Sequence, residues 1–352
     1  MKLLGIHHIT AIATDPQRNL DFYTQMLGLR LVKRTVNFDD AGSYHFYFGD
    51  RIGTPGTIIT FFPWPGARRG SRGTSQVVAT SFAIPREAVD YWKSRLQDHG
   101  VFSEEITPRF GNSVLRLPDP DGLIVELVAS NHLDDVSLDF PNNVPHEFAI
   151  RGFHAPTLEV QNAKPTEQLL TEAFGFKMIA EEKGRRRFSL DQQSTSKQLD
   201  LLERPDGPFG NIAAGTVHHI AFRAANDEEQ RQWREKLADL GLGVTPVIDR
   251  QYFHSIYFRE PGGILFEIAT DTPGFVIDEP VNQLGENLKL PPQFESQRAT
   301  IERATEIEQV GFVTSCPVQK QERGRGSRTN VRRNKAMNEI EVFHVVASAS
   351  CR

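Results

Sequence analysis

The stretch "HIAFRAANDEEQRQWREKLADLGLGV" (219–244) decides the fold, because the chain contains its pattern more than once. An apolar strand comes first, a charged amphipathic helix follows, and Gly241 stands where that helix should end. Glycine is common at this position because it accepts the left-handed backbone that closes a helix. "HITAIATDPQRNLDFYTQMLGLRLV" (8–32) has the same order, with a turn at Asp15-Pro16 and with Gly28 as its glycine. An internal repeat therefore organises this chain.

Two weaker copies of the pattern lie between these two stretches, at 81–101 and 154–179. Short alternating runs typical of strands follow each helix. The second and fourth copies also end alike, since "PDPDGLIVELVAS" (118–130) matches "REPGGILFEIATD" (259–271) and aligns Glu126 with Glu267. We therefore predict four βαβββ modules, at 3–62, 75–130, 150–204 and 216–270, with a linker at 131–147. This pattern indicates an α+β fold in two tandem halves, with curled mixed sheets that enclose a cavity and helices outside.

Composition excludes several classes of protein. The 352 residues carry a net charge of −5 at 39% hydrophobic content, which is typical of a globular protein and unfavourable for bulk nucleic-acid binding. No apolar run reaches the length of a membrane span, and His7 and His8 interrupt the apolar start of the chain, so neither a membrane protein nor a signal peptide is expected. Both cysteines, Cys316 and Cys351, lie near the C-terminus, which argues against a disulfide framework and favours the cytoplasm.

The repeated modules and the Pro-Gly turns before Glu126 and Glu267 resemble the vicinal oxygen chelate superfamily, which includes glyoxalase I, extradiol dioxygenases and bleomycin-resistance proteins. The resemblance covers residues 3–275 and implies two domains of two modules each, at 1–135 and 148–275. A C-terminal extension at 276–310 follows. Residues 311–352 resemble nothing in the rest of the chain. Eight Lys or Arg against three Asp or Glu make them a basic segment that we expect to be disordered.

In this superfamily, the first and last strands of two paired modules supply metal ligands, as the resemblance implies. Pairing modules one and four brings together two imidazoles and one carboxylate, the facial triad of non-haem Fe(II) oxygenases. Pairing modules three and four gives four ligands, a set nearer to glyoxalase I. The residues alone leave the pairing open. The three candidate sets are His8, His219 and Glu267 for modules one and four; His154, Asp200, His219 and Glu267 for three and four; and Glu126, His154 and Asp200 for two and three.

The local context of the histidines favours the first set. "GIHHIT" (5–10), "TVHHIAF" (216–222) and "DRQYFHSIYFREPGGILFEIATD" (249–271) resemble the hydroquinone-type ring-cleaving dioxygenases. That resemblance implies that the second histidine of each pair and the terminal glutamate hold iron, namely His8, His219 and Glu267. Independently, Glu267 stands in the apolar strand "GGILFEIA", where an uncompensated carboxylate is costly to bury. The expected metal is Fe(II), with Mn(II) less favoured.

Further site residues are expected around this triad. Thr10 stands two residues beyond His8, so strand alternation turns it to the same face. The resemblance implies that Arg250 stabilises an anion and that Tyr257 donates a hydrogen bond. His7 and His218 are expected as acid–base groups or as structural supports of their neighbours. Simple alternation turns His7 away from His8, so either the strand bends or His7 acts from behind.

The function expected from the resemblance is an extradiol-type ring-cleaving dioxygenase that inserts O₂ into a small aromatic diol of the hydroquinone or catechol type. A glyoxalase-type isomerase with four protein ligands, or a metal-free binding protein that confers resistance, are the alternatives. Thr60 stands where a fourth ligand would be needed, which counts against the isomerase. His154 reads as structural and Glu126 as a relic of duplication or an acid behind the ligands. A homo-oligomer is compatible with the sequence.

Overall fold

The computed structural model describes residues 1–304, and these residues form the four modules expected from the repeats. Each module has one helix after its first strand and three further strands. The first contains β1 (Ile6–Ala13), α1 (Pro16–Asp21), β2 (Arg30–Asn37), β3 (Asp40–Gly49) and β4 (Ile58–Pro63). The second contains β5 (Gln76–Pro85), α2 (Val89–Asp98), β6 (Thr107–Arg109), β7 (Asn112–Pro118) and β8 (Ile124–Ser130). The third contains β9 (Thr157–Val160), α3 (Ala163–Gln168), β10 (Lys177–Glu182), β11 (Arg185–Ser189) and β12 (Gln198–Glu203). The fourth contains β13 (Val217–Ala224), α4 (Asp227–Asp239), β14 (Ile248–Asp249), β15 (Phe253–Arg259) and β16 (Leu265–Pro273).

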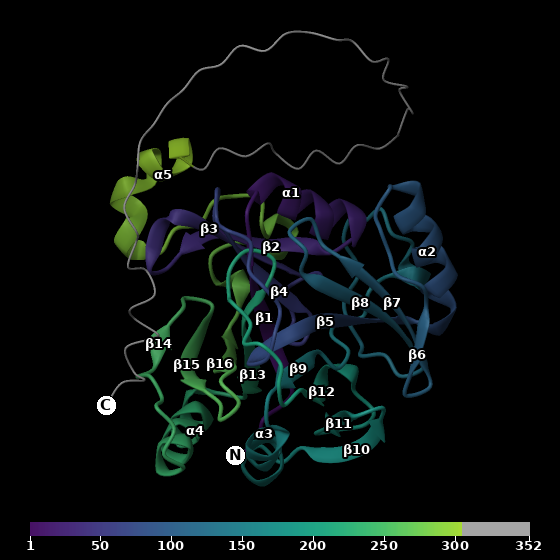
Figure 1. Ribbon diagram of the computed structural model, residues 1–352. Coiled ribbons are helices and arrows are strands. Elements are labelled where there is room, and N and C mark those ends of the chain that lie inside the picture. The colour runs from purple at the N-terminus through teal and green to yellow at the C-terminus, as the bar shows by residue number, and fades with distance from the viewer. Residues whose placement is uncertain (305–352) are drawn as a thin grey trace. The chain divides into compact units, whose positions relative to one another are not determined.

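The helices form where the sequence supplies caps and an apolar stripe. Asn226 caps α4 by accepting a hydrogen bond from the backbone N–H of Glu229, and Trp233 and Leu237 bury one face of that helix. Gly241 follows with a φ of +79°, as the repeat predicts. Figure 1 shows the module helices on the outside of the strands. Within residues 1–304, no helix is both long and apolar enough to cross a membrane.

The modules pair across the chain rather than along it. The strands form two eight-stranded sheets, with the orders β14-β15-β16-β13-β1-β4-β3-β2 and β10-β11-β12-β9-β5-β8-β7-β6. The first sheet therefore combines modules one and four, and the second combines modules two and three (Figure 1). In each sheet the first strands of two modules meet antiparallel, β1 against β13 and β5 against β9. The fold class is α+β with mixed sheets, as expected, and residues 1–135 and 148–275 each contribute strands to both sheets.

A bulge interrupts each of the two strands that meet at the centre of the first sheet. Ile6 pairs with Phe222 but His8 pairs with Ala221, which leaves His7 as the extra residue of β1. Further along, the register shifts again and leaves His218 as the extra residue of β13. A bulge places an extra residue out of the normal alternation. The strand therefore bends at the paired histidines, which was one of the two geometries that the sequence allowed.

The C-terminal extension packs on the outer strands of the first module. Ile301 in α5 (Arg298–Ala304) and Leu290 form a small apolar cluster with Val36 of β2. Nearer the sheet, the buried ammonium of Lys33 contacts Asp278 and Glu279, each at 2.5 Å. The basic segment at 311–352, with both cysteines, lies outside the described residues.

Candidate metal centre

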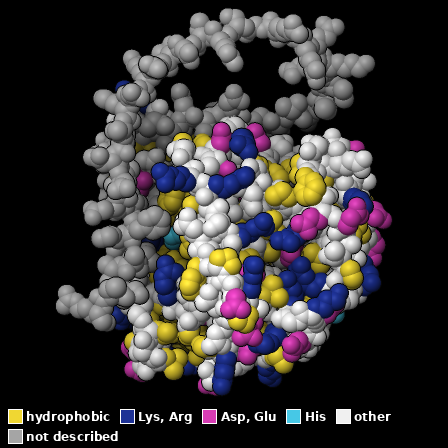
Figure 2. Space-filling view, in the orientation of Figure 1, with side chains coloured by type: hydrophobic (Ala, Val, Ile, Leu, Met, Phe, Trp, Pro, Cys, Tyr) yellow, Lys and Arg dark blue, Asp and Glu magenta, His cyan; other side chains and the backbone are white. Residues whose placement is uncertain are grey.

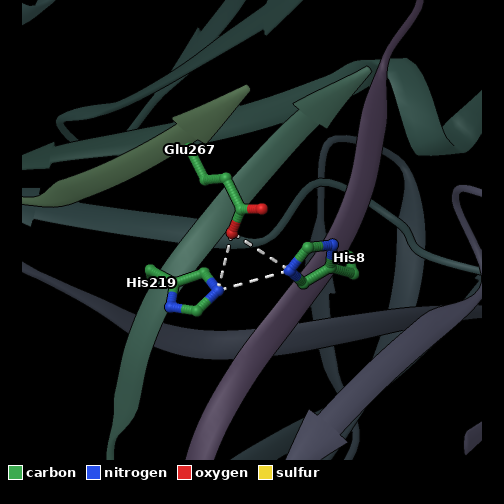
Figure 3. A group of neighbouring side chains, drawn as sticks. All are labelled: His8, His219 and Glu267. Carbon is green, nitrogen blue, oxygen red and sulfur yellow. Dashed lines mark hydrogen bonds and ion pairs between the residues drawn. The ribbon is translucent and has the colours of Figure 1, made fainter. Parts of the chain in front are cut away.

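Three predicted ligands meet on three adjacent strands of the first sheet. His8 lies on β1, His219 on β13 and Glu267 on β16, in the strand order β16-β13-β1. The Nε2 atoms of His8 and His219 lie 3.2 Å apart, and Glu267 Oε2 lies 3.2 Å from the first and 2.9 Å from the second (Figure 3). All three residues are buried. Among residues 1–304, this is the one group of three or more histidine, cysteine or acidic side chains whose ligand atoms converge in this way.

The geometry fits a metal ion. Neighbouring ligands on one face of an octahedron with bonds of about 2.1 Å stand about 3 Å apart, which matches the three distances. Ser255 donates a 2.5 Å hydrogen bond to Glu267 Oε1, and this holds the carboxylate while Oε2, which accepts no hydrogen bond, faces the two rings. Burial by itself would raise the pKa of Glu267, and the positive charge of a protonated His8 or His219 lowers it well below the usual range. When both rings are neutral, a bound cation would supply that positive charge between the carboxylate and the two nitrogen atoms.

His7 determines which nitrogen of His8 is free to bind a metal. Nε2 of His7 lies 3.2 Å from the carbonyl oxygen of Thr270, which only accepts, so this nitrogen carries the proton. Burial, and then the neighbouring His8, hold the pKa of His7 well below its ordinary value, so the ring is neutral and its Nδ1 is an acceptor. Nδ1 of His8 lies 2.9 Å away and must donate to it. The lone pair of His8 is thereby placed on Nε2, the atom that faces Glu267.

His218 stands in the same relation to His219. Their Nδ1 atoms lie 2.8 Å apart, and burial followed by the effect of His219 lowers the pKa of His218 to about 3. A neutral His218 can accept the Nδ1 proton of His219, which again leaves Nε2 of His219 to face Glu267. The two bulges at the centre of the sheet bring each outer histidine beside its inner neighbour.

Arg250 and Tyr257 lie together beside the triad. The ring of Tyr257 makes an edge contact with His219, and Tyr257 is paired in register with Glu267. The guanidinium of Arg250 lies over the Tyr257 ring, with Nε 3.4 Å from the hydroxyl, and contacts Asp39 at 3.1 Å. Burial, and next the charge of Glu267, raises the pKa of Tyr257 to about 12, so the phenol keeps its proton at neutral pH.

Thr10 belongs to a buried chain of hydrogen bonds that the sequence did not reveal in full. Its hydroxyl lies 2.9 Å from that of Thr60, which lies 2.8 Å from Nε2 of His45. Nδ1 of His45 lies 2.9 Å from the hydroxyl of Tyr47. Burial lowers the pKa of His45 well below its ordinary value, and the nearby rings of His8 and His219 lower it further.

The repeat contained a signal for two of these missed residues. Tyr47 pairs with Thr60 in the first module as Tyr257 pairs with Glu267 in the fourth, so the two tyrosines occupy equivalent positions. Thr60 occupies in the first module the position that Glu267 occupies in the fourth. Thr60 pairs with Thr10, two residues after His8, and Glu267 pairs with Ala221, two residues after His219. Aligning the third strands of the modules, in addition to the first and last, would have found Tyr47 and, two residues before it, His45.

The alternative ligand sets do not assemble. Asp200 and Glu126 lie on strands of the second sheet, and His154 lies just before β9, with its backbone N–H donating to Ser81 of β5. Within residues 1–304 none of the three belongs to a metal-ligating group, either with one another or with His219 and Glu267. Arg109 donates two hydrogen bonds of 2.7 Å to Glu126, and Arg187 donates two, of 2.7 and 3.0 Å, to Asp200. Burial by itself would raise the pKa of Glu126, but Arg109 outweighs it and lowers it to about 2. Arginine side chains therefore neutralise both acids.

Comparison with known proteins assigns the chain to a family. The profile of the Glyoxalase/Bleomycin resistance protein/Dioxygenase superfamily matches residues 5–127 and 152–268. The Bacillus subtilis (strain 168) protein named "Putative ring-cleaving dioxygenase MhqO" is 47% identical over 86% of this chain and 96% of its own. The chlorohydroquinone/hydroquinone 1,2-dioxygenase of Sphingobium indicum is 34% identical over 83% of this chain and 92% of its own. A crystal structure described as a "putative dioxygenase from Bacillus subtilis" superposes with a TM-score of 0.84 at 46% identity, covering 88% of this chain and 99% of that one.

Proposed function

We propose, from the premise that this chain belongs to the Glyoxalase/Bleomycin resistance protein/Dioxygenase superfamily, that it is an Fe(II)-dependent ring-cleaving dioxygenase of the extradiol type. The proposed substrates are O₂ and a small aromatic diol, with hydroquinones preferred to catechols because one relative is named for hydroquinone. The observation that carries the proposal is the triangle of His8 Nε2, His219 Nε2 and Glu267 Oε2, with sides of 2.9 to 3.2 Å.

The donor set favours Fe(II), with Mn(II) second. Two imidazoles and one carboxylate on one face of a cation leave adjacent positions open for other ligands, which is the arrangement of non-haem Fe(II) oxygenases. When bound, such a cation would bring an electron-rich ring and O₂ together and carry electrons between them. His7 and His218 hold the two imidazoles in the tautomer that this requires.

The polar side chains around the triad supply charge and proton positions. The Arg250 guanidinium, held by Asp39, places a fixed positive charge beside Tyr257, where it would stabilise a negatively charged oxygen of the substrate. The Tyr257 hydroxyl keeps its proton and would donate a hydrogen bond to the substrate. On the other side, the chain Thr10–Thr60–His45–Tyr47 connects buried hydroxyls through a neutral imidazole, which can take up a proton at one nitrogen and release one from the other.

Two other functions use the same fold and are less well supported. A glyoxalase-type isomerase favours four protein ligands, but Thr60 stands at the fourth position and its hydroxyl is engaged by Thr10 and His45. A metal-free binding protein has no need of three buried ligand atoms that converge on one point. Consumption of O₂ separates the dioxygenase from both.

The test is iron content and O₂ uptake of the protein loaded anaerobically with Fe(II). We expect uptake with hydroquinones and a ring-cleaved acid as product, and we expect His8→Ala to lose both bound iron and uptake. His99→Ala is the matched control, because His99 is an exposed histidine at the end of α2. Full iron content and undiminished O₂ uptake in His8→Ala would overturn the assignment. A panel of substituted hydroquinones and catechols would then define the substrate.

A further inference from the structure

A cavity of about 490 Å³ lies on the second sheet, away from the metal centre. Its walls come from all the strands of that sheet except β10, together with the loop before β5. Five arginines and two glutamates supply its charged lining, which are Arg72, Arg109, Arg116, Arg185, Arg204, Glu126 and Glu159. Figure 2 shows basic side chains gathered over the region where Figure 1 places β5, β9 and β12. The lining is therefore positive overall.

This cavity is the counterpart of the metal centre in the duplicated fold. Glu126 pairs with Ser81, and Glu267 pairs with Ala221. Ala79 precedes Ser81 by two residues, just as His219 precedes Ala221 by two residues. Ala79, which has no ligand atom, stands where the first sheet has a histidine. Arg109 donates to both carboxylate oxygens of Glu126, and Ser81 also donates to one of them. The carboxylate that faces two imidazoles in the first sheet thus has a counterpart that faces a guanidinium in the second.

Two of the arginines are not engaged by a short ion pair within residues 1–304, namely the exposed Arg72 and the partly buried Arg116. The side chain of Arg72 makes no hydrogen bond or ion pair with the described residues. Arg116 reaches Glu104 only at 3.8 Å, and its buried Nε has no hydrogen-bond partner there. Partial burial and then the charge of Arg116 lower the pKa of Arg72, while Glu104 and Glu159 act in the opposite direction. Both guanidinium groups therefore keep N–H donors from which an anion in the cavity could accept hydrogen bonds.

The remaining lining matches an organic anion rather than a bare ion. Val78, Ala79 and Leu202 form an apolar wall, and Thr157 adds a hydroxyl that already accepts a hydrogen bond from Arg185. The volume is within the range of small-molecule sites, which is roughly 300–1,000 Å³. Guanidinium groups bind carboxylates and phosphates through paired N–H donors.

We propose that this cavity binds a small organic anion that carries one or two carboxylate or phosphate groups, with Arg72 and Arg116 as the residues that recognise its charge. The site is separate from the metal centre and does not depend on the dioxygenase activity. Its apolar wall favours a ligand with a compact hydrocarbon body over inorganic phosphate.

The experiment is calorimetric titration of the iron-loaded full-length protein at low salt with phthalate, phenyl phosphate, inorganic phosphate and neutral phthalamide. We expect saturable binding of phthalate, phenyl phosphate or both, weaker binding of inorganic phosphate, and none of phthalamide. Preference between the first two identifies the anionic group. Arg72→Gln and Arg116→Gln should each weaken binding by about tenfold. Arg86→Gln, which changes an exposed arginine elsewhere, should leave it within about twofold of the original.

Two outcomes would overturn the proposal. One is the absence of saturable binding of either organic anion to a protein whose circular dichroism shows it to be folded. The other is binding that both arginine variants retain in full. Glu267→Gln separates this site from the metal centre, because it should leave anion affinity unchanged; anion binding that disappears in that variant would place the anion at the metal centre instead.

Discussion

The two sheets follow one plan but surround the equivalent buried acid with different side chains. Glu267 in the first sheet faces the nitrogen atoms of His8 and His219. Glu126 in the second sheet faces the guanidinium of Arg109. A carboxylate on an apolar strand needs a positive partner, because burying it alone is costly. The fold therefore supplies the buried acid in both sheets, whereas the residues around it differ: two imidazoles in the first sheet and a guanidinium in the second.

The strand next to the acid also carries different residue types in the two sheets. In the first sheet it carries tyrosines, since Tyr257 pairs with Glu267 and Tyr47 with Thr60. In the second sheet it carries arginines, since Arg116 pairs with Glu126 and Arg187 with Asp200. Phenols next to a metal site donate hydrogen bonds without competing for the ligands. Arginines at the equivalent positions repel a metal ion and attract an anion instead.

The largest effect should come from removing the acid of the first sheet. Glu267→Gln keeps the shape of the side chain but removes the charge that faces His8 and His219. We expect bound iron to be lost and ring cleavage to fall by roughly a thousandfold, since metal assistance is worth several kcal/mol. Metal analysis and O₂ uptake measure both. A variant with normal iron content and normal O₂ uptake would show that the buried acid of the first sheet does not hold a metal ion.

Removing the arginine of the second sheet should act on stability. Arg109→Met leaves the buried Glu126 with only the hydrogen bond from Ser81. We expect the free energy of unfolding to fall by about 3 kcal/mol, as is usual when one partner of a buried ion pair is lost. Urea denaturation measures this difference. Arg86→Met is the control for loss of an exposed arginine, and equal stability of the two variants would contradict the predicted role of Arg109.

The outer histidines should have a smaller effect on metal affinity than the ligands. His7→Leu removes the acceptor of the His8 Nδ1 proton, so the lone pair on Nε2 is no longer enforced. We expect iron affinity to fall by about 10- to 100-fold, the usual consequence of losing such a partner. Competition with a chelator measures it. His7→Gln, which restores an acceptor oxygen, should recover part of the affinity, and if His7→Leu binds iron as tightly as the original protein the tautomer argument fails.

The smallest expected effect is a pH dependence of the free energy of unfolding, and it comes from Glu126 in the second sheet. The pKa of Glu126 is about 2 in the folded protein, below the usual value of 4.5. Its ionisation therefore stabilises the fold above pH 4.5, and this contribution is lost as the pH falls towards 2. The stability difference between the original protein and Glu126→Gln should shrink by about 2 kcal/mol from pH 7 to pH 3. Urea denaturation at both pH values tests this, and a difference that stays constant would mean that Glu126 is not held ionised by Arg109.

Much of this architecture could be predicted from local sequence. The module boundaries follow from helix caps, glycines such as Gly241 and the Pro-Gly turns, which act within a few residues of themselves. The resemblance of "GIHHIT" and "TVHHIAF" to a known subgroup pointed to His8, His219 and Glu267. His45 and Tyr47 were missed, because a histidine and a tyrosine in the aromatic-rich strand β3 are indistinguishable from core residues until the strand is placed beside β4.

The amino-acid sequence by itself determined the four modules and the residue types available to each, because capping, strand alternation and turn chemistry are local. Only the tertiary structure decided that module one pairs with module four, since that pairing depends on which strand edges meet across more than 200 residues of chain. The same long-range pairing brings His8 to His219, and so gives Glu267 its second imidazole partner. Arg109 and Glu126, by contrast, belong to one module and lie only 17 residues apart in the chain, so their contact is set within that module.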